Sequence, residues 1–125
     1  MKTIISTLEA PKAIGPYSQA VRYGDLLLVS GMIALDPRTG EMAGADIETQ
    51  AIRVLENLKA VVEAAGMGLQ NVLKSTVFLK DMNDFAKFNE IYGRYFPEVP
   101  PARETVQVAK LPRDAAIEIS VICGA

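Results

Sequence analysis

One carboxylate lies within a pattern of alternating apolar residues near the end of the chain. Glu118 stands between Ile117 and Ile119, in a segment over 116–123 that we predict to be a strand. Side chains of a strand alternate between two faces, so Glu118 lies on the face opposite its isoleucine neighbours. If that face is buried, the pKa of the carboxyl rises, and the group can act as a general acid or base near neutral pH. The structural alternative is an exposed edge-strand glutamate or one paired with a structural cation, which is the commoner case on spacing alone.

A second charged residue, Arg103, follows the sequence Val99-Pro100-Pro101-Ala102. The two prolines stiffen the entry into a short predicted strand and restrict where the guanidinium points. Arginine is suited to a planar carboxylate, which it holds through two parallel hydrogen bonds. The alternative, again commoner for a single residue, is an arginine on the surface or in a salt bridge.

Two glycine-containing corners add hydroxyl groups to these candidates. The first is Gly15-Pro16-Tyr17-Ser18, and the second is Ser30-Gly31-Met32. Glycine allows the backbone to approach a ligand closely, and the hydroxyls of Tyr17 and Ser30 can form hydrogen bonds with it. Taken singly, each corner is more often a turn than a binding site.

Two helices are predicted to support these residues. Apolar residues recur with helical spacing from Ile47 to Ala65, with Asp46 as a suitable N-cap and Gly66 as the stop. A second helix is predicted over 85–96, where Asn83 or an adjacent aspartate could cap it and Pro97 ends it. We expect most of the aromatic residues on this second helix to belong to the core.

Six strands complete the predicted elements, and their order around the helices indicates an α+β fold. Tyr23-Gly24-Asp25-Leu26 has the glycine-aspartate turn of a hairpin. The predicted strands cover residues 3–6, 20–23, 26–32, 72–80, 104–109 and 116–123.

Two helices on one sheet can cover only one of its faces. The segment 26–29 is apolar at consecutive positions, so it presents apolar side chains to both faces. The strand over 72–79 should do the same, with Val72, Thr76 and Phe78 on one side and Leu73, Val77 and Leu79 on the other. Leaving an apolar face exposed to water costs free energy. We therefore expect a second copy of the chain to cover it, in a homo-oligomeric ring.

The composition excludes several classes of site. The 125 residues include no histidine and one cysteine, Cys123, so a Ser-His-Asp triad, a zinc finger and an intramolecular disulfide are impossible. The net charge is −2, and no basic block favours nucleic acid. No apolar run approaches the ~20 residues that span a bilayer, and the apolar stretch at 3–5 is too short for a secretory signal. We therefore expect one soluble, cytoplasmic domain over 1–125, without a membrane partner.

Taken in order, these residues resemble the RidA/YjgF family of small trimeric imine deaminases. The similarity runs almost from end to end and has the arginine and glutamate motifs in register. Its motifs are Ala13-Ile14-Gly15-Pro16-Tyr17-Ser18-Gln19-Ala20, Val29-Ser30-Gly31, Val62-Glu63-Ala64-Ala65-Gly66, Lys74-Ser75-Thr76-Val77-Phe78-Leu79-Lys80-Asp81, Phe85 with Asn89 and Tyr92, Pro101-Ala102-Arg103, and Leu111-Pro112-Arg113 leading into Ile117-Glu118-Ile119.

The resemblance implies a chorismate-mutase-like fold: a single mixed sheet of about six strands, two helices on one face, and a homotrimer with pockets between subunits. It implies hydrolysis, without cofactor or metal, of 2-aminoacrylate and 2-iminopropanoate to pyruvate and ammonia, and of related 2-imino acids such as 2-iminobutanoate. By the same resemblance, Arg103 holds the substrate carboxylate and Glu118 works with the attacking water. The remaining pocket residues that it implies are Tyr17, Ser30, Gly31, Asn89 and Thr105.

The sequence departs from the family pattern at three positions, Glu104, Thr105 and Met32. On a strand, Glu104 points away from Arg103, but a bent backbone would let it neutralise the guanidinium. That possibility supports an alternative function, a trimeric module that binds small 2-keto or amino acids without turnover. RNA cleavage is disfavoured by the negative charge and the missing histidine.

Overall fold

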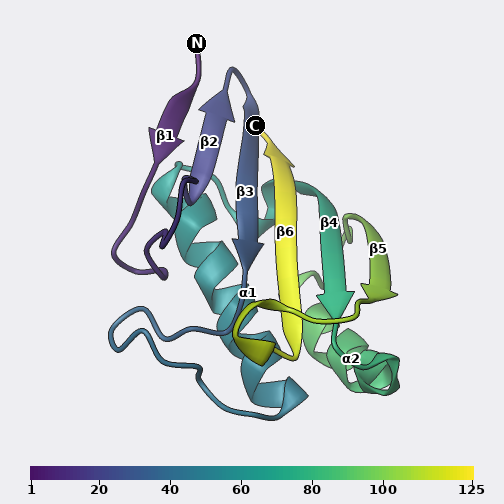
Figure 1. Ribbon diagram of the computed structural model, residues 1–125. Helices are drawn as coiled ribbons and strands as arrows, with labels where there is room; N and C mark the ends of the chain where they lie inside the picture. Colours follow the sequence, from purple (N-terminus) through teal and green to yellow (C-terminus); the bar gives the residue numbers. More distant parts are fainter.

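Six strands form one mixed sheet in the order β1-β2-β3-β6-β4-β5 (Figure 1). The computed structural model describes residues 1–125. All neighbouring strands are antiparallel except β4 and β5, which run parallel. The strands are β1 (Thr3–Ile5), β2 (Ala20–Tyr23), β3 (Leu26–Met32), β4 (Val72–Leu79), β5 (Ala102–Gln107) and β6 (Ile117–Gly124).

Helix α1 (Ile47–Ala64) has the predicted boundaries to within a residue. The Asp46 carboxylate accepts a hydrogen bond from the Thr49 N–H at 2.9 Å, which satisfies one of the free donors at the helix start. The helix stops before Gly66, whose φ of +80° favours glycine. None of the helices is long and apolar enough to cross a membrane.

Helix α2 (Phe85–Tyr95) follows a short 3₁₀ turn over Met82–Asp84. The prediction that Asn83 or an adjacent aspartate caps α2 is confirmed for the position of the cap but not for its hydrogen bond. Asp84 holds the N-cap position without a side-chain hydrogen bond, and Asp81 caps the preceding turn by accepting from the Asn83 N–H at 2.9 Å. The extra turn moves the side-chain cap three residues upstream.

Both helices pack on the same face of the sheet (Figure 1). The predicted inward face of β6 is confirmed, because Ile117, Ile119, Val121 and Cys123 are all buried. Burial also raises the pKa of the Cys123 thiol to about 11, so it stays protonated and unreactive at neutral pH.

The other face of the sheet carries no helix, as expected (Figure 1). On β3, Leu27 and Val29 are buried while Leu26 and Leu28 are exposed, so this strand presents apolar side chains to both faces. We call the uncovered side of the sheet the open face. Its exposed apolar side chains are Ile4, Tyr23, Leu26, Leu28, Leu73, Val106 and Ile122.

The predicted faces of β4 are wrong at its first two residues. The register against β6 shifts between Val72 and Lys74, so Leu73 is an extra residue in the strand. This bulge turns Val72 into the core, whereas Leu73 lies exposed on the open face. Downstream of the bulge, the buried Val77 and Leu79 follow the predicted alternation.

Strand β5 begins two residues earlier than the predicted 104–109 and ends at Gln107. It pairs in parallel with β4 from the first residue after Pro101, where Ala102 lies opposite Lys74. Arg103 is therefore inside the strand, and its direction is set by the pairing with β4 as well as by the prolines.

Candidate functional site

Arg103 lies on the helix-covered face of β5, at the edge of the sheet. In the parallel pair its partner is Ser75 of β4, and parallel partners point to the same face. Ser75 is fully buried, and its Oγ accepts a hydrogen bond of 2.8 Å from the Tyr92 hydroxyl of α2. The guanidinium of Arg103 consequently extends along α2.

Three aromatic rings of α2 support this guanidinium. The Arg103 Cζ atom lies 4.7 Å from the ring centre of Tyr92, 5.3 Å from that of Phe88 and 5.7 Å from that of Phe85. Nη2 donates a hydrogen bond of 2.8 Å to the Asn89 Oδ1 atom. Cation–π contacts of this kind restrict the side chain while they leave its remaining N–H groups free. Arg103 has no carboxylate partner among the ion pairs of the chain.

Sequence reasoning assigned these aromatic residues to the core and missed their contact with Arg103. Phe88 and Tyr92 are buried, so the core assignment is correct for both. Their spacing with Phe85 was the available signal, since positions separated by three and four residues share a helix face. Burial raises the pKa of the Tyr92 hydroxyl, which keeps it protonated as the donor to Ser75.

The two residues of β5 that depart from the family pattern, Glu104 and Thr105, lie on opposite faces of the strand. Glu104 forms an ion pair of 3.0 Å with Lys74 on the neighbouring strand, on the face opposite Arg103. It therefore does not neutralise the guanidinium. Thr105 lies on the same face as Arg103, and its Oγ1 atom is buried without a hydrogen-bond partner. The third departure, Met32, is a core residue.

Glu118 lies on the open face of β6, next to Gly31 of β3. Its side chain is partly buried, and this burial raises the pKa of the carboxyl above its ordinary value. A Cβ atom added to Gly31 would lie 2.9 Å from the Glu118 Cδ atom, so only glycine gives the carboxylate this position. The carboxylate has no ion pair or hydrogen bond within the chain. The carboxylate can therefore accept a proton, or a hydrogen bond from a water molecule.

The corner residues Ser30 and Tyr17 are connected to Gly31: Ser30 precedes it in the chain, and Tyr17 precedes Ser18, which Ser30 contacts. The Ser30 hydroxyl donates to the Ser18 carbonyl oxygen at 2.6 Å, so only its lone pairs remain for a ligand. The Tyr17 ring is half exposed, and its hydroxyl accepts a long hydrogen bond of 3.5 Å from the Ile14 N–H. The Tyr17 hydroxyl proton is therefore free to be donated.

The structure does not bring Arg103 and Glu118 into one pocket of a single chain. Both residues lie on strands that pair with β4: Arg103 is opposite Ser75, and Glu118 is opposite Phe78. Ser75 and Phe78 are three residues apart in a regular part of the strand, so they point to opposite faces. Arg103 and Glu118 line neither the cavity beside Tyr95 and Phe96 nor the cavity beside Asp36 and Arg113.

One chain thus holds two half-sites on opposite faces of the sheet. We call them the arginine half-site, with Arg103, Asn89 and Thr105, and the glutamate half-site, with Glu118, Gly31, Ser30 and Tyr17. No group of three or more aspartate, glutamate or cysteine side chains gathers to form a metal site.

Comparisons with known proteins agree on one family. The family model described as endoribonuclease L-PSP matches residues 7–124. A RutC family protein of Saccharolobus solfataricus is 60% identical over 122 residues, which cover 98% of this chain and 97% of that protein.

Solved structures agree as well. Escherichia coli TdcF, whose structure contains bound serine, superposes with a TM-score of 0.95 at 46% identity and covers 98% of each chain. RidA from the Antarctic bacterium Psychrobacter sp. PAMC 21119 superposes with a TM-score of 0.95 at 43% identity, over 98% of this chain and 99% of that one. These likenesses extend over nearly the whole length of the chain.

Proposed function

The chain belongs to the endoribonuclease L-PSP family, the RidA/YjgF family, and from this membership and its two half-sites we propose that it is a hydrolytic deaminase of reactive 2-imino and 2-enamino acids. Its substrates in this proposal are 2-aminoacrylate, its tautomer 2-iminopropanoate, and related acids such as 2-iminobutanoate. The products are the 2-keto acid and ammonia.

The observation that carries the proposal is a partly buried guanidinium, fixed by three rings and one amide, without a carboxylate of its own. Such a group is ready to bind an anionic ligand, and two charge-assisted hydrogen bonds contribute about 1.5–3 kcal/mol each. The buried Thr105 hydroxyl without a partner adds a donor on the same face. The serine bound to TdcF is a small acid of the same class.

The hydrolysis itself needs little more than a base and a positioned water. Water adds to the electrophilic carbon of the protonated imine while the Glu118 carboxylate accepts one of the water protons, which gives a neutral carbinolamine. Glu118 then returns that proton to the amino nitrogen. The C–N bond breaks and ammonia leaves, while the hydroxyl of the carbinolamine gives its proton to the Glu118 carboxylate as the carbonyl forms. The raised pKa of Glu118 suits both steps, because the burial that raises it makes the carboxylate a stronger base and favours the neutral acid that returns the proton.

We further propose that the arginine half-site of one copy faces the glutamate half-site of a second copy, in a homotrimer. The exposed apolar open face supports this assembly, since fully burying a leucine or isoleucine contributes about 1.5–3 kcal/mol. It also explains why two groups of one reaction lie on opposite faces of one sheet.

The first experiment follows pyruvate formation from freshly generated 2-aminoacrylate. We expect the protein to accelerate pyruvate release well above the rate in buffer. If hydrolysis stays at the buffer rate while 2-keto acids bind normally, the alternative of a binding module without turnover is correct instead. The ion pair of Glu104 with Lys74 removes the original reason for favouring that alternative.

Subunit complementation tests the shared site. Arg103→Ala and Glu118→Gln should each be nearly inactive alone, with Glu118→Gln slowed on the order of 10²-fold. Unfolding and refolding equal amounts of them together gives a random mixture of trimers, in which about one interface in four has both native residues. We expect activity to return in the mixture. If both groups acted within one chain, mixing would restore nothing.

A further inference from the structure

A cleft that shares no residue with either half-site lies where three loops meet. It has a volume of about 320 Å³. Its walls come from the N-terminal loop, from the loop after β3, and from the loop before β6. The lining residues used below are Lys12, Ile14, Asp36, Arg38, Thr39 and Arg113.

The cleft concentrates positive charge in a chain whose net charge is −2. Lys12 has no ion pair, and the nearest carboxylate contacts of Arg38 and Arg113 are long, at 4.0 Å to Asp36 and 3.9 Å to Glu41. Three cations and one carboxylate, Asp36, therefore line the cleft, which leaves it with a net positive charge. The mutual repulsion of the cations is relieved if an anion binds between them.

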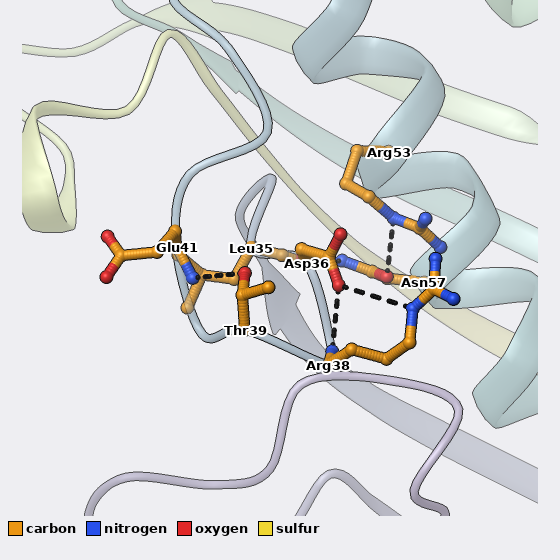
Figure 2. Close-up of polar contacts among 7 residues, drawn as sticks. All are labelled: Leu35, Asp36, Arg38, Thr39, Glu41, Arg53 and Asn57. Carbon is orange, nitrogen blue, oxygen red and sulfur yellow. Dashed lines mark hydrogen bonds and ion pairs between the residues drawn. The ribbon is translucent and has the colours of Figure 1, made fainter.

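Asp36 is the one carboxylate that lines the cleft, and it already has a hydrogen bond and an ion pair with Arg38 (Figure 2). It accepts a hydrogen bond of 2.8 Å from the Arg38 N–H, which together with the Arg38 and Arg53 guanidinium groups holds its pKa below the usual range. Thr39 Oγ1 accepts from the Glu41 N–H at 3.1 Å, which leaves the hydroxyl proton free. The loop after β3 thus offers a ligand both a hydroxyl donor, Thr39, and a cation, Arg38.

The position of Arg113 is maintained by an unusual backbone. Arg113 and the following Asp114 both have φ of +55°, a left-handed conformation that is strained for a non-glycine residue. Arg113 Nη1 donates to the Gly40 carbonyl oxygen at 3.0 Å, and Asp114 pairs with Lys80 at 3.0 Å. These contacts hold the guanidinium at the cleft and tie two of its loops together.

We propose that this cleft binds a phosphoryl group, either free phosphate or the phosphate of a small ester. Donors that converge from three loops suit a tetrahedral dianion with several oxygens better than a planar carboxylate. Ile14 and Leu35 give an apolar wall that the organic part of an ester can contact. The proposal does not depend on the deaminase activity.

The test is a titration of ¹⁵N-labelled protein with inorganic phosphate, β-glycerophosphate or acetate, at constant ionic strength. We expect saturable shifts of the amides of Lys12, residues 38–40 and Arg113 with both phosphates, and binding at least about tenfold weaker with acetate. The stronger of the two phosphates identifies the source of the phosphoryl group. Equal binding of acetate overturns the proposal, as do shifts that never saturate.

Matched variants separate a cleft from general surface charge. Lys12→Gln with Arg38→Gln removes two exposed cations of the cleft, and Lys59→Gln with Lys87→Gln removes two cations elsewhere. We expect the first pair to weaken phosphate binding about tenfold or more and the second to change it less than twofold. An equal loss of phosphate affinity in both pairs means that binding depends only on the net charge of the protein. No loss of affinity in the first pair excludes the cleft as the binding site.

Discussion

At the scale of single residues, Arg103 and Glu118 are held in different ways. Arg103 is held by three rings and one amide of its own chain, so a ligand meets an oriented guanidinium with free N–H groups. Glu118 has no hydrogen-bonding partner and is partly desolvated, so its charged form is disfavoured. The charge of Glu118 therefore lowers the stability of the fold, and this effect can be measured.

Glu118→Gln should stabilise the protein at pH 7. Because burial raises the pKa of Glu118 in the folded state, the native protein binds a proton more tightly than the unfolded chain. The stability of the native protein then falls as pH rises from the ordinary value of 4.5 to the raised one, and stays lower above it. Thermal unfolding at pH 7 should show a higher Tm for Glu118→Gln.

The control for this prediction is the same measurement at low pH. Well below pH 4.5 the carboxyl is protonated in both states, so the advantage of Glu118→Gln should vanish. A variant that is no more stable than the native protein at pH 7 would show that the Glu118 charge costs the fold nothing.

At the scale of elements, the irregular part of β3 determines where the Glu118 carboxylate lies. The register between β3 and β6 shifts between Val29 and Met32, around Ser30 and Gly31. Gly31→Ala should push the carboxylate away, since the contact is with the flexible end of the Glu118 side chain. We expect a fall in kcat with little change in Tm, checked with 2-aminoacrylate. A control is Gly93→Ala on α2, where a Cβ meets no atom within 4 Å.

The position of α2 against β4 depends on the buried bond between Tyr92 and Ser75. Tyr92→Phe should destabilise the protein by about 1–3 kcal/mol, because the Ser75 hydroxyl loses its partner in the core. Denaturant unfolding of Tyr92→Phe, Ser75→Ala and the double variant measures the coupling. We expect the double variant to be clearly more stable than the sum of the two losses; simple additivity would mean that the bond contributes nothing.

At the scale of the whole molecule, the open face is the feature that requires an explanation. Leu28→Arg places a charge on that face, and we expect it to dissociate the proposed trimer, with a mass of about 40 kDa, into folded 13.5 kDa chains without activity. Light scattering measures the mass. The matched control is Ala64→Arg at the exposed end of α1, which should leave the assembly intact. A native protein that runs as a stable monomer would contradict the assembly and the shared site together.

Most of the local elements and the family could be predicted from the amino-acid sequence alone. The bounds of β2 and β3, the cap at Asp46 and the inward face of β6 were all predicted correctly, because each depends on residues close together in the chain. The motifs around Arg103 and Glu118 identified the family for the same reason, since they are short stretches with recognisable spacing. The roles that the resemblance gives these residues remain predictions.

How these elements face one another depends on strand pairing between segments far apart in the chain. The opposite orientation of Arg103 and Glu118 follows from their registers against Ser75 and Phe78, which join segments far apart in the chain. The bulge at Leu73 and the aromatic support under Arg103 depend on the same long-range pairing. A shift of one residue in a strand register reverses the face of every side chain, and no local pattern specifies that register.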